Sequence, residues 1–269
     1  MPGTLAPPGY GRGILLVVEH FWTWYRRNWR ATAVSSVLQP LLFLLAFGIG
    51  FGSLVDRGGG GDAATGGVSY LVYLAPALLA VSAVQSAAFE STYPVLSGFK
   101  WQRIYHAMTA GPITPGQVAL GHLGWVAAKT AGSGAIYVIV IGLVGGVAGP
   151  GIVVSLLAAV LTGSAVAALV TAFAATVESE GAAFNVIFRF VVIPMTLFSG
   201  TFFPVDRLPA WIRPVAWVSP LWHGTELARA AALGRWVLLP AAGHLAYLLA
   251  LLAVGVVLAT RLFTRRLAQ

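Results

Sequence analysis

The side chains that could take part in chemistry are few and scattered along this chain of 269 residues. The histidines show neither the His-Glu-x-x-His spacing nor any other clustering typical of metal ligands, and there is no cysteine to act as a thiolate ligand. Ser133, in AGSGA, and His244 could be paired as the nucleophile and base of an intramembrane serine protease. Small-residue triplets and single histidines also occur in packed helices. We therefore expect no catalytic residue, no metal and no cofactor on this chain.

Lys129 is the most unusual charge, because it lies inside a long apolar run. A lysine buried in a membrane is costly and is a functional candidate by default, but its long side chain can extend the amine to the interface. We expect Lys129 to reach the inner interface and not to bind a substrate. No ladder of acidic residues accompanies it inside the apolar runs, which argues against ion-coupled transport.

The elements that must position these residues are membrane helices. Hydrophobic residues make up 58% of the chain and charged residues 9%, whereas about a quarter of the residues in soluble domains are charged. Runs of about 20 apolar residues fit transmembrane helices. This composition predicts an all-α polytopic membrane protein of one domain, 1–269, with a bundle of six transmembrane helices over 31–260. The six predicted spans are 31–54, 69–89, 123–146, 152–177, 184–203 and 237–260.

The basic residues indicate an orientation. With a cytoplasmic N-terminus, the loops on the inner side hold most of the arginines and lysines, among them Arg103, Arg261, Arg265 and Arg266. The positive-inside rule then predicts a multi-pass protein of the cell membrane with both termini in the cytoplasm. The net charge of +8 is explained by this orientation, so that no nucleic-acid partner is needed.

The segment before the first span, ILLVVEHFWTWYRRNWR, is amphipathic. Its aromatic and aliphatic side chains fall on one face of a helix, and the charged ones lie opposite. We predict an interface helix over 9–30 that lies in the membrane surface with its aromatic face toward the lipid, either as an anchor or as a docking site for a partner. Its charged residues are Glu19, Arg26, Arg27 and Arg30.

The connection between the second and third spans contains glycines and prolines that bracket residues 99–110. This segment has the length for about three turns of helix, and a short helix held out from the membrane is suited to act as a lever. A basic loop that lies against the membrane is the alternative. The candidate contact residues are Phe99, Lys100, Trp101, Arg103, Tyr105 and His106.

In the fourth span, small residues recur every four positions from Ser155 to Ala175. Such a stripe lets another helix approach closely, within the chain or across a dimer.

Residues 199–234, SGTFFPVDRLPAWIRPVAWVSPLWHGTELARAAALG, follow the fifth span. Their aromatic side chains suit a membrane interface, and their prolines prevent a continuous spanning helix. We predict two short helices, 209–218 and 220–233, the second with Ser219 as N-cap and Gly234 at its end. Together they would form an outer re-entrant cap. The cap residues singled out are Gly200, Phe202, Phe203, Pro204, Leu208, Pro209, Trp211 and Pro220.

This segment resembles the signature of type-2 ABC-transporter permeases, which export lipo-oligosaccharides, surface polysaccharides and hydrophobic antibiotics. The shared pattern is a small-Gly-x-x-Phe-Pro start, Leu-Pro-x-Trp, a Pro-Leu pair, and then an Arg and a Gly. Residues 91–125 are similar to the cytoplasmic segment of the nodulation-factor and daunorubicin exporter branch. One departure is Gly121-His122, where many relatives have Gly-Glu.

The resemblance implies the permease subunit of an exporter for an amphipathic, lipid-linked or saccharide-containing substrate. A second copy, or a related permease, would complete the channel, and a separate ABC ATPase would bind ATP and Mg. Residues 99–110 would be the coupling helix, 9–30 the interface helix, and Glu178 and Glu180 part of a second, shorter ATPase contact. An intramembrane enzyme and a passive channel or scaffold are the alternatives. The sequence names neither the substrate nor the pairing of subunits, and leaves roles for Lys129 and His122 in transport open.

Overall fold

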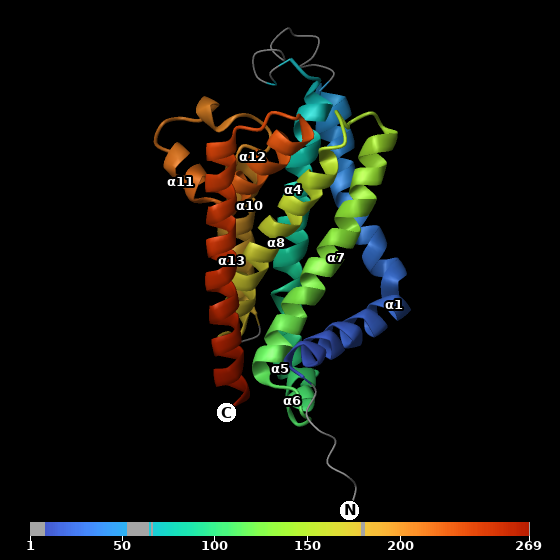
Figure 1. Cartoon of the computed structure of the whole chain (residues 1–269), viewed down its shortest axis with the longest axis vertical. Coiled ribbons are helices and arrows are strands. Elements are labelled where there is room, and N and C mark those ends of the chain that lie inside the picture. The colour runs from blue at the N-terminus through green and yellow to red at the C-terminus, as the bar shows by residue number, and fades with distance from the viewer. Residues whose placement is uncertain (1–8, 53–64, 66, 179–180, 269) are drawn as a thin grey trace, which may run out of the picture.

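The computed structural model describes residues 9–52, 65, 67–178 and 181–268. Over these residues every regular element is a helix, which confirms the predicted all-α class. Figure 1 shows the long helices packed side by side in an elongated bundle.

The bundle has two different ends. Helix α1 (Tyr10–Phe43) begins, and α13 (Leu238–Leu267) ends, at the end that also carries α5 (Tyr93–Lys100) and α6 (Ile104–Thr109) (Figure 1). We call this the basal end. The opposite, distal end carries α11 (Arg213–Val218) and the start of α13.

Among the described residues, four helical stretches are long and apolar enough to cross a membrane. They match the second, third, fourth and sixth predicted spans. These stretches are Tyr70–Lys100, which joins α4 (Tyr70–Glu90) to α5, together with α7 (Pro115–Leu143), α8 (Ile152–Ala174) and α13.

The other two predicted spans have a different form. The fifth is a shorter apolar stretch, Ala182–Phe198, made of α9 (Ala182–Ile187), the π-helical turn η2 (Phe188–Val192) and α10 (Ile193–Phe198). The first falls on α1 and the π-helical η1 (Leu44–Phe51), and its last residues, 53 and 54, lie outside the described part.

Helix α8 is in the middle of the bundle and contacts α4, α7, α12 (Pro220–Ala232) and α13. Its small-residue stripe is buried from Ser155 to Ala175, which confirms that the stripe serves packing within the chain. At Gly163 a Cβ atom would lie 2.9 Å from the carbonyl oxygen of Ala83, so α4 approaches α8 more closely than a larger residue permits. The Ser155 hydroxyl donates to the carbonyl of Ala228, 2.6 Å away, on α12.

The predicted interface helix is the first part of α1, which continues without interruption into the first span and changes direction on the way (Figure 1). Its apolar face was expected against lipid, but part of it packs on α7. Val17 is fully buried over Gly121, where a Cβ would lie 2.5 Å from the Cβ of Val17. Because Gly121 has no side chain, α1 can pack closely against α7 at this point. Glu19, Arg26 and Arg27 are exposed as predicted, whereas the side chain of Arg30 lies outside the described part.

At the distal end the chain between α10 and α13 contains η3 (Val205–Arg207), α11 and α12. Helix α12 begins at Pro220 and stops before Gly234, which has a left-handed φ of 64°, as predicted. The first predicted helix is shorter than expected, because α11 begins only at Arg213. The Ser219 hydroxyl does not cap α12 but forms a hydrogen bond of 2.6 Å with that of Ser199.

Candidate functional site at the basal end

The predicted lever, 99–110, is not one helix. Helix α5 ends at Lys100, and α6 begins at Ile104 after Arg103, which has a left-handed φ of 51°. This conformation is unusual for a residue other than glycine. It reverses the chain, so that α6 packs back on α5. A Cβ at Gly98 would lie 2.4 Å from the ring of Tyr105, which shows how closely the two helices approach.

Three aromatic rings hold this α5–α6 hairpin against the end of α13. The ring centroid of Phe99 lies 4.8 Å from that of Tyr105 and 4.7 Å from that of Phe263, and Tyr105 and Phe263 are 5.3 Å apart. All three side chains are buried. Phe99 and Tyr105, which we predicted as partner contacts, therefore face inward and support the hairpin instead.

The remaining predicted contact residues form an exposed tip. Lys100, Trp101, Arg103 and His106 are all exposed, and Trp101 leaves 53% of its surface uncovered. We use "tip" below for these four residues. A large aromatic side chain among three basic or titratable ones is a typical composition for the centre of a protein–protein contact.

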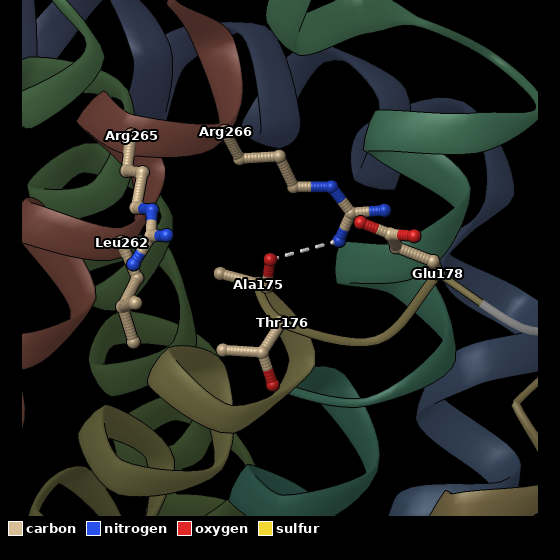
Figure 2. A pocket seen from close by; sticks show the side chains of 6 residues that line it. All are labelled: Ala175, Thr176, Glu178, Leu262, Arg265 and Arg266. Atoms are coloured by element: carbon tan, nitrogen blue, oxygen red, sulfur yellow. Dashed lines mark hydrogen bonds between the residues drawn. The ribbon is translucent and has the colours of Figure 1, made fainter. Parts of the chain in front are cut away.

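Arg266 joins the hairpin to the ends of α8 and α13. One terminal nitrogen of its guanidinium donates to the carbonyl oxygens of Ala174 and Ala175, each 3.1 Å away. Figure 2 shows the bond to Ala175. The guanidinium carbon also lies 4.3 Å from the centroid of the Phe99 ring. A cation suits the negative end of a helix and the face of an aromatic ring. Neither Arg266 nor Phe263 was predicted to belong to the site. The two adjacent arginines in the last turn, Arg265 and Arg266, were counted only as charges that indicate the orientation.

A small cavity of about 210 Å³ opens beside Arg266 (Figure 2). Figure 2 shows the Glu178 carboxylate turned toward the Arg266 guanidinium. The Glu178 carbonyl oxygen lies 3.4 Å from Nζ of Lys100, so this predicted second contact is next to the tip. Glu180, the other predicted residue, lies outside the described part. The cavity is lined by Ala175, Thr176, Glu178, Leu262, Arg265 and Arg266.

The hairpin is also connected to α7. The Tyr105 hydroxyl lies 3.3 Å from Nδ1 of His122. Burial raises the pKa of Tyr105, so its hydroxyl keeps its proton and can donate it to the imidazole nitrogen. His122 therefore links α7 to α6, a contact that the sequence pattern did not reveal.

Lys129, which we expected to reach the inner interface, pairs with an acidic residue. Its Nζ atom lies 2.6 Å from a carboxylate oxygen of Glu90 at the end of α4, and only 8% and 15% of the two side chains are exposed. The Tyr25 ring of α1 lies 5.7 Å from the same amine. Two opposite charges in contact are less costly in a low-dielectric setting than either charge alone. The pair therefore joins α4 to α7 beside the first part of α1.

At the distal end, the start of the predicted cap is fixed on α4. Arg229 is only 8% exposed, and its guanidinium donates to the carbonyls of Gly200 and Thr201, at 2.9 and 3.4 Å. The same group lies 3.9 Å from the Tyr73 ring of α4. The Tyr70 hydroxyl donates to the Phe202 carbonyl, 3.0 Å away. The structure thus brings Gly200 and Phe202 together on α4.

The other predicted cap residues have separate roles. Leu208 is buried in a small cluster with Val205 and Ala216. Phe203, Pro209 and Trp211 are exposed, and Trp211 leaves 78% of its surface uncovered. Pro204 directly precedes η3, and Pro220 begins α12.

Ser133 and His244 are each engaged with other groups. The Ser133 hydroxyl donates to the carbonyl of Thr130, 3.1 Å away in the same helix. His244 forms a ring-nitrogen contact of 2.8 Å with His223 of α12. Neither interaction prepares a serine for nucleophilic attack, which needs a hydrogen bond between the serine and a base. In the described part of the chain, no group of three or more His, Asp or Glu side chains could hold a metal ion.

Comparisons with known proteins support the resemblance. Residues 13–233 match the family model for the ABC-2 type transporter. The chain is 34% identical over 266 residues to Nodulation protein J of Rhizobium meliloti (strain 1021), covering 91% of this chain and 94% of that protein. It is 33% identical over 256 residues to Nodulation protein J of Rhizobium leguminosarum bv. trifolii, covering 91% and 93% of the two chains.

Proposed function

Because the chain belongs to the ABC-2 type transporter family, we propose that it is the membrane-spanning subunit of an exporter driven by a separate ABC ATPase. The family establishes a membrane transporter subunit and not a catalytic enzyme. We propose two partners. One is the ABC ATPase, which would bind ATP and Mg, and the other is a second permease copy, or a related permease, that completes the channel.

The exposed tip on the buried aromatic triad is the observation that carries this proposal. Trp101 and its basic neighbours project from the basal end, while Phe99 and Tyr105 fix the hairpin to Phe263 of α13. A partner that binds the tip and moves the hairpin would therefore move α13 as well. Through Arg266 the same displacement reaches the end of α8, which is in the middle of the bundle. Rigid elements that move together in this way can convert ATPase closure into a reorientation of the spans.

We further propose that the basal end is cytoplasmic and that residues 199–234 form the outer re-entrant cap. The exposed charges of the first part of α1, Glu19, Arg26 and Arg27, then lie on the ATPase side as well. The proposed substrate is an amphipathic, lipid-linked or saccharide-containing molecule, as the resemblance implies.

Co-purification tests the partnership directly. Tagged protein purified from its own cells should retain an ATPase, and Trp101→Ala should reduce the amount retained. Trp211→Ala is the matched control, because Trp211 is also a highly exposed tryptophan but lies at the distal end. If no ATPase is retained by the unaltered protein, the proposed mechanism is wrong. If both variants retain as much ATPase as the unaltered protein does, the tip is not the contact.

A passive channel or scaffold and an intramembrane serine protease are the competing functions, and no contact described above favours either. A passive channel would retain no ATPase. A protease that used Ser133 would lose activity in a Ser133→Ala variant.

A further inference from the structure

The helical stretch α9–η2–α10 has an apolar face that no other described helix covers. Within the described residues, η2 contacts α4, and α10 contacts α11. The opposite side chains stay exposed, with 73% of Phe190 and 51% of Ile193 uncovered. Val186, Val191, Leu197 and Phe198 extend the same exposed apolar surface. In a membrane protein such a face contacts lipid chains, the tail of a substrate or another apolar helix.

Arg189 lies within this apolar face. It is exposed, it is preceded by Phe188 and followed by Phe190, and it forms no hydrogen bond, ion pair or ring contact with any residue that the structure describes. It follows the start of α9, at the basal end, by seven residues, which corresponds to about 10 Å along a helix axis. An arginine this near the basal end can extend its guanidinium to the membrane surface. There it can pair with an anion from outside the described residues.

The local backbone supports a binding role for Arg189. Residues Phe188–Val192 form a π-helical turn between two short α-helices. Such turns are rare and occur frequently at functional sites. Arg229, which is buried, and Arg266, which is partly buried, are each bonded to backbone carbonyl oxygens of this chain. Arg189 differs from both, because its guanidinium keeps its full set of donors for an external ligand.

A second copy of this chain is a poor source for the anion. Among the described acidic residues, Glu90 is paired with Lys129, and Glu226 is paired with Arg229. Asp206 lies in the distal segment. Glu178 is turned toward Arg266 (Figure 2), and Glu19 lies in the first part of α1. An anionic amphiphile, by contrast, supplies a headgroup for the cation and hydrocarbon for the surrounding apolar side chains.

We propose that Arg189 binds the anionic headgroup of the amphiphile that this subunit exports, with the hydrocarbon of the same molecule lying along α9–η2–α10. The inference rests on the proposed function and specifies its substrate class. Planar guanidinium groups bind phosphate and carboxylate oxygens through paired hydrogen bonds. A phosphate or carboxylate headgroup is thus the chemistry that fits, whereas a neutral or cationic drug does not satisfy the arginine.

Native mass spectrometry of the purified full-length protein tests this binding with defined probes. Phosphatidylglycerol should remain bound to the unaltered chain, whereas zwitterionic phosphatidylcholine should not. An arginine near the membrane surface contributes about 1 kcal/mol to anionic lipid binding, which corresponds to a roughly five-fold change in the dissociation constant. We expect Arg189→Gln to raise the dissociation constant for phosphatidylglycerol by about this factor and so to lower its occupancy, and Arg189→Lys to keep most of the binding. Circular dichroism and gel filtration will show that each variant is folded.

Arg261→Gln is the matched control, because Arg261 is an exposed arginine near the basal end of α13. It should leave the occupancy unchanged. Equal losses in both arginine variants, or no loss in Arg189→Gln, would overturn the site. Displacement of the lipid by inorganic phosphate alone would show that a free anion is the ligand. If Arg189→Gln splits a dimer without altering lipid binding, the face is a subunit interface and our assignment is wrong.

The export step is tested separately in the complex with the retained ATPase. Phosphatidylglycerol should stimulate ATP hydrolysis by the unaltered complex and not by the Arg189→Gln complex. Equal stimulation of both would overturn the assignment of Arg189 to the substrate. A chain that binds the lipid through Arg189 but retains no ATPase contradicts the proposed function alone. A chain that retains the ATPase but binds lipid independently of Arg189 contradicts this inference alone.

Discussion

The guanidinium of Arg266 lies 4.3 Å from the Phe99 ring and at the same time caps the carbonyl end of α8. One side chain of the last helix thus touches both the α5–α6 hairpin and the middle helix of the bundle. The rings of Tyr105 and Phe263 also pack on the Phe99 ring, with centroids 4.8 and 4.7 Å away. Movement of the hairpin is therefore linked to α8 and α13 by direct contact.

Replacing Arg266 should weaken this link more than it weakens the membrane bundle. Arg266→Ala removes the stacking on Phe99 and two hydrogen bonds to α8, and we expect a loss of about 1–3 kcal/mol in the free energy of unfolding. Arg265→Ala is the control, because Arg265 lines the cavity beside it. Thermal unfolding in detergent measures stability, and ATP hydrolysis against transport in the complex measures coupling. Equal behaviour of the two variants would show that Arg266 has no linking role.

The close contact between α5 and α6 predicts a strong effect of a single methyl group. Gly98→Ala would place a Cβ 2.4 Å from the Tyr105 ring, so the ring or the helix must shift. We expect a destabilisation of about 1–3 kcal/mol, together with loss of the hydrogen bond to His122. Gly132→Ala, in α7, is the control, since its Cβ would meet nothing within 4 Å. That change should leave stability unchanged or raise it slightly. Unfolding in increasing denaturant compares the two variants.

The buried pair of Lys129 and Glu90 predicts a non-additive double variant. Lys129→Met leaves the Glu90 carboxylate buried without its cation, which should cost about 3–5 kcal/mol, whereas Lys129→Arg keeps the pair. Adding Glu90→Gln to Lys129→Met should restore most of the loss. The unaltered protein, Lys129→Met, Glu90→Gln and the double variant form a double-mutant cycle that is measured by thermal unfolding. Additive effects would mean that the two charges do not interact.

The sequence was most informative where local pattern decides structure. The repeat of small residues predicted the packing face of α8, and Pro220 and Gly234 predicted where α12 begins and ends. Both features depend on neighbours within a few residues. The same is true of the long apolar stretches that became α4, α7, α8 and α13.

The sequence was least informative where distant residues meet. Glu90 and Lys129 are 39 positions apart, and neither spacing nor composition showed that the end of α4 reaches α7 at that level. The break of the predicted lever depends on a left-handed Arg103, a conformation with no distinctive signal in a non-glycine residue. Arg266 reaches Phe99 only because the last helix returns to the hairpin. The sequence therefore located the candidate site along the chain. It did not show which residues of the site are buried, as Phe99 and Tyr105 are, and which are exposed, as Trp101 is.

The last prediction concerns the side of the membrane on which residues 199–237 enter and leave. Their two ends join α10 and α13, which both reach the distal end of the bundle (Figure 1). Because the chain has no cysteine, single cysteines can be placed at Asp206, Leu221, Arg235 and, at the basal end, Trp101. An impermeant thiol reagent applied outside intact cells should label Asp206→Cys and Arg235→Cys. Leu221→Cys should stay unlabelled, because Leu221 is fully buried. Trp101→Cys should react only after the membrane is opened. Labelling of Asp206→Cys and Arg235→Cys from opposite sides would mean that the segment crosses the membrane, and the outer cap would then have to be abandoned.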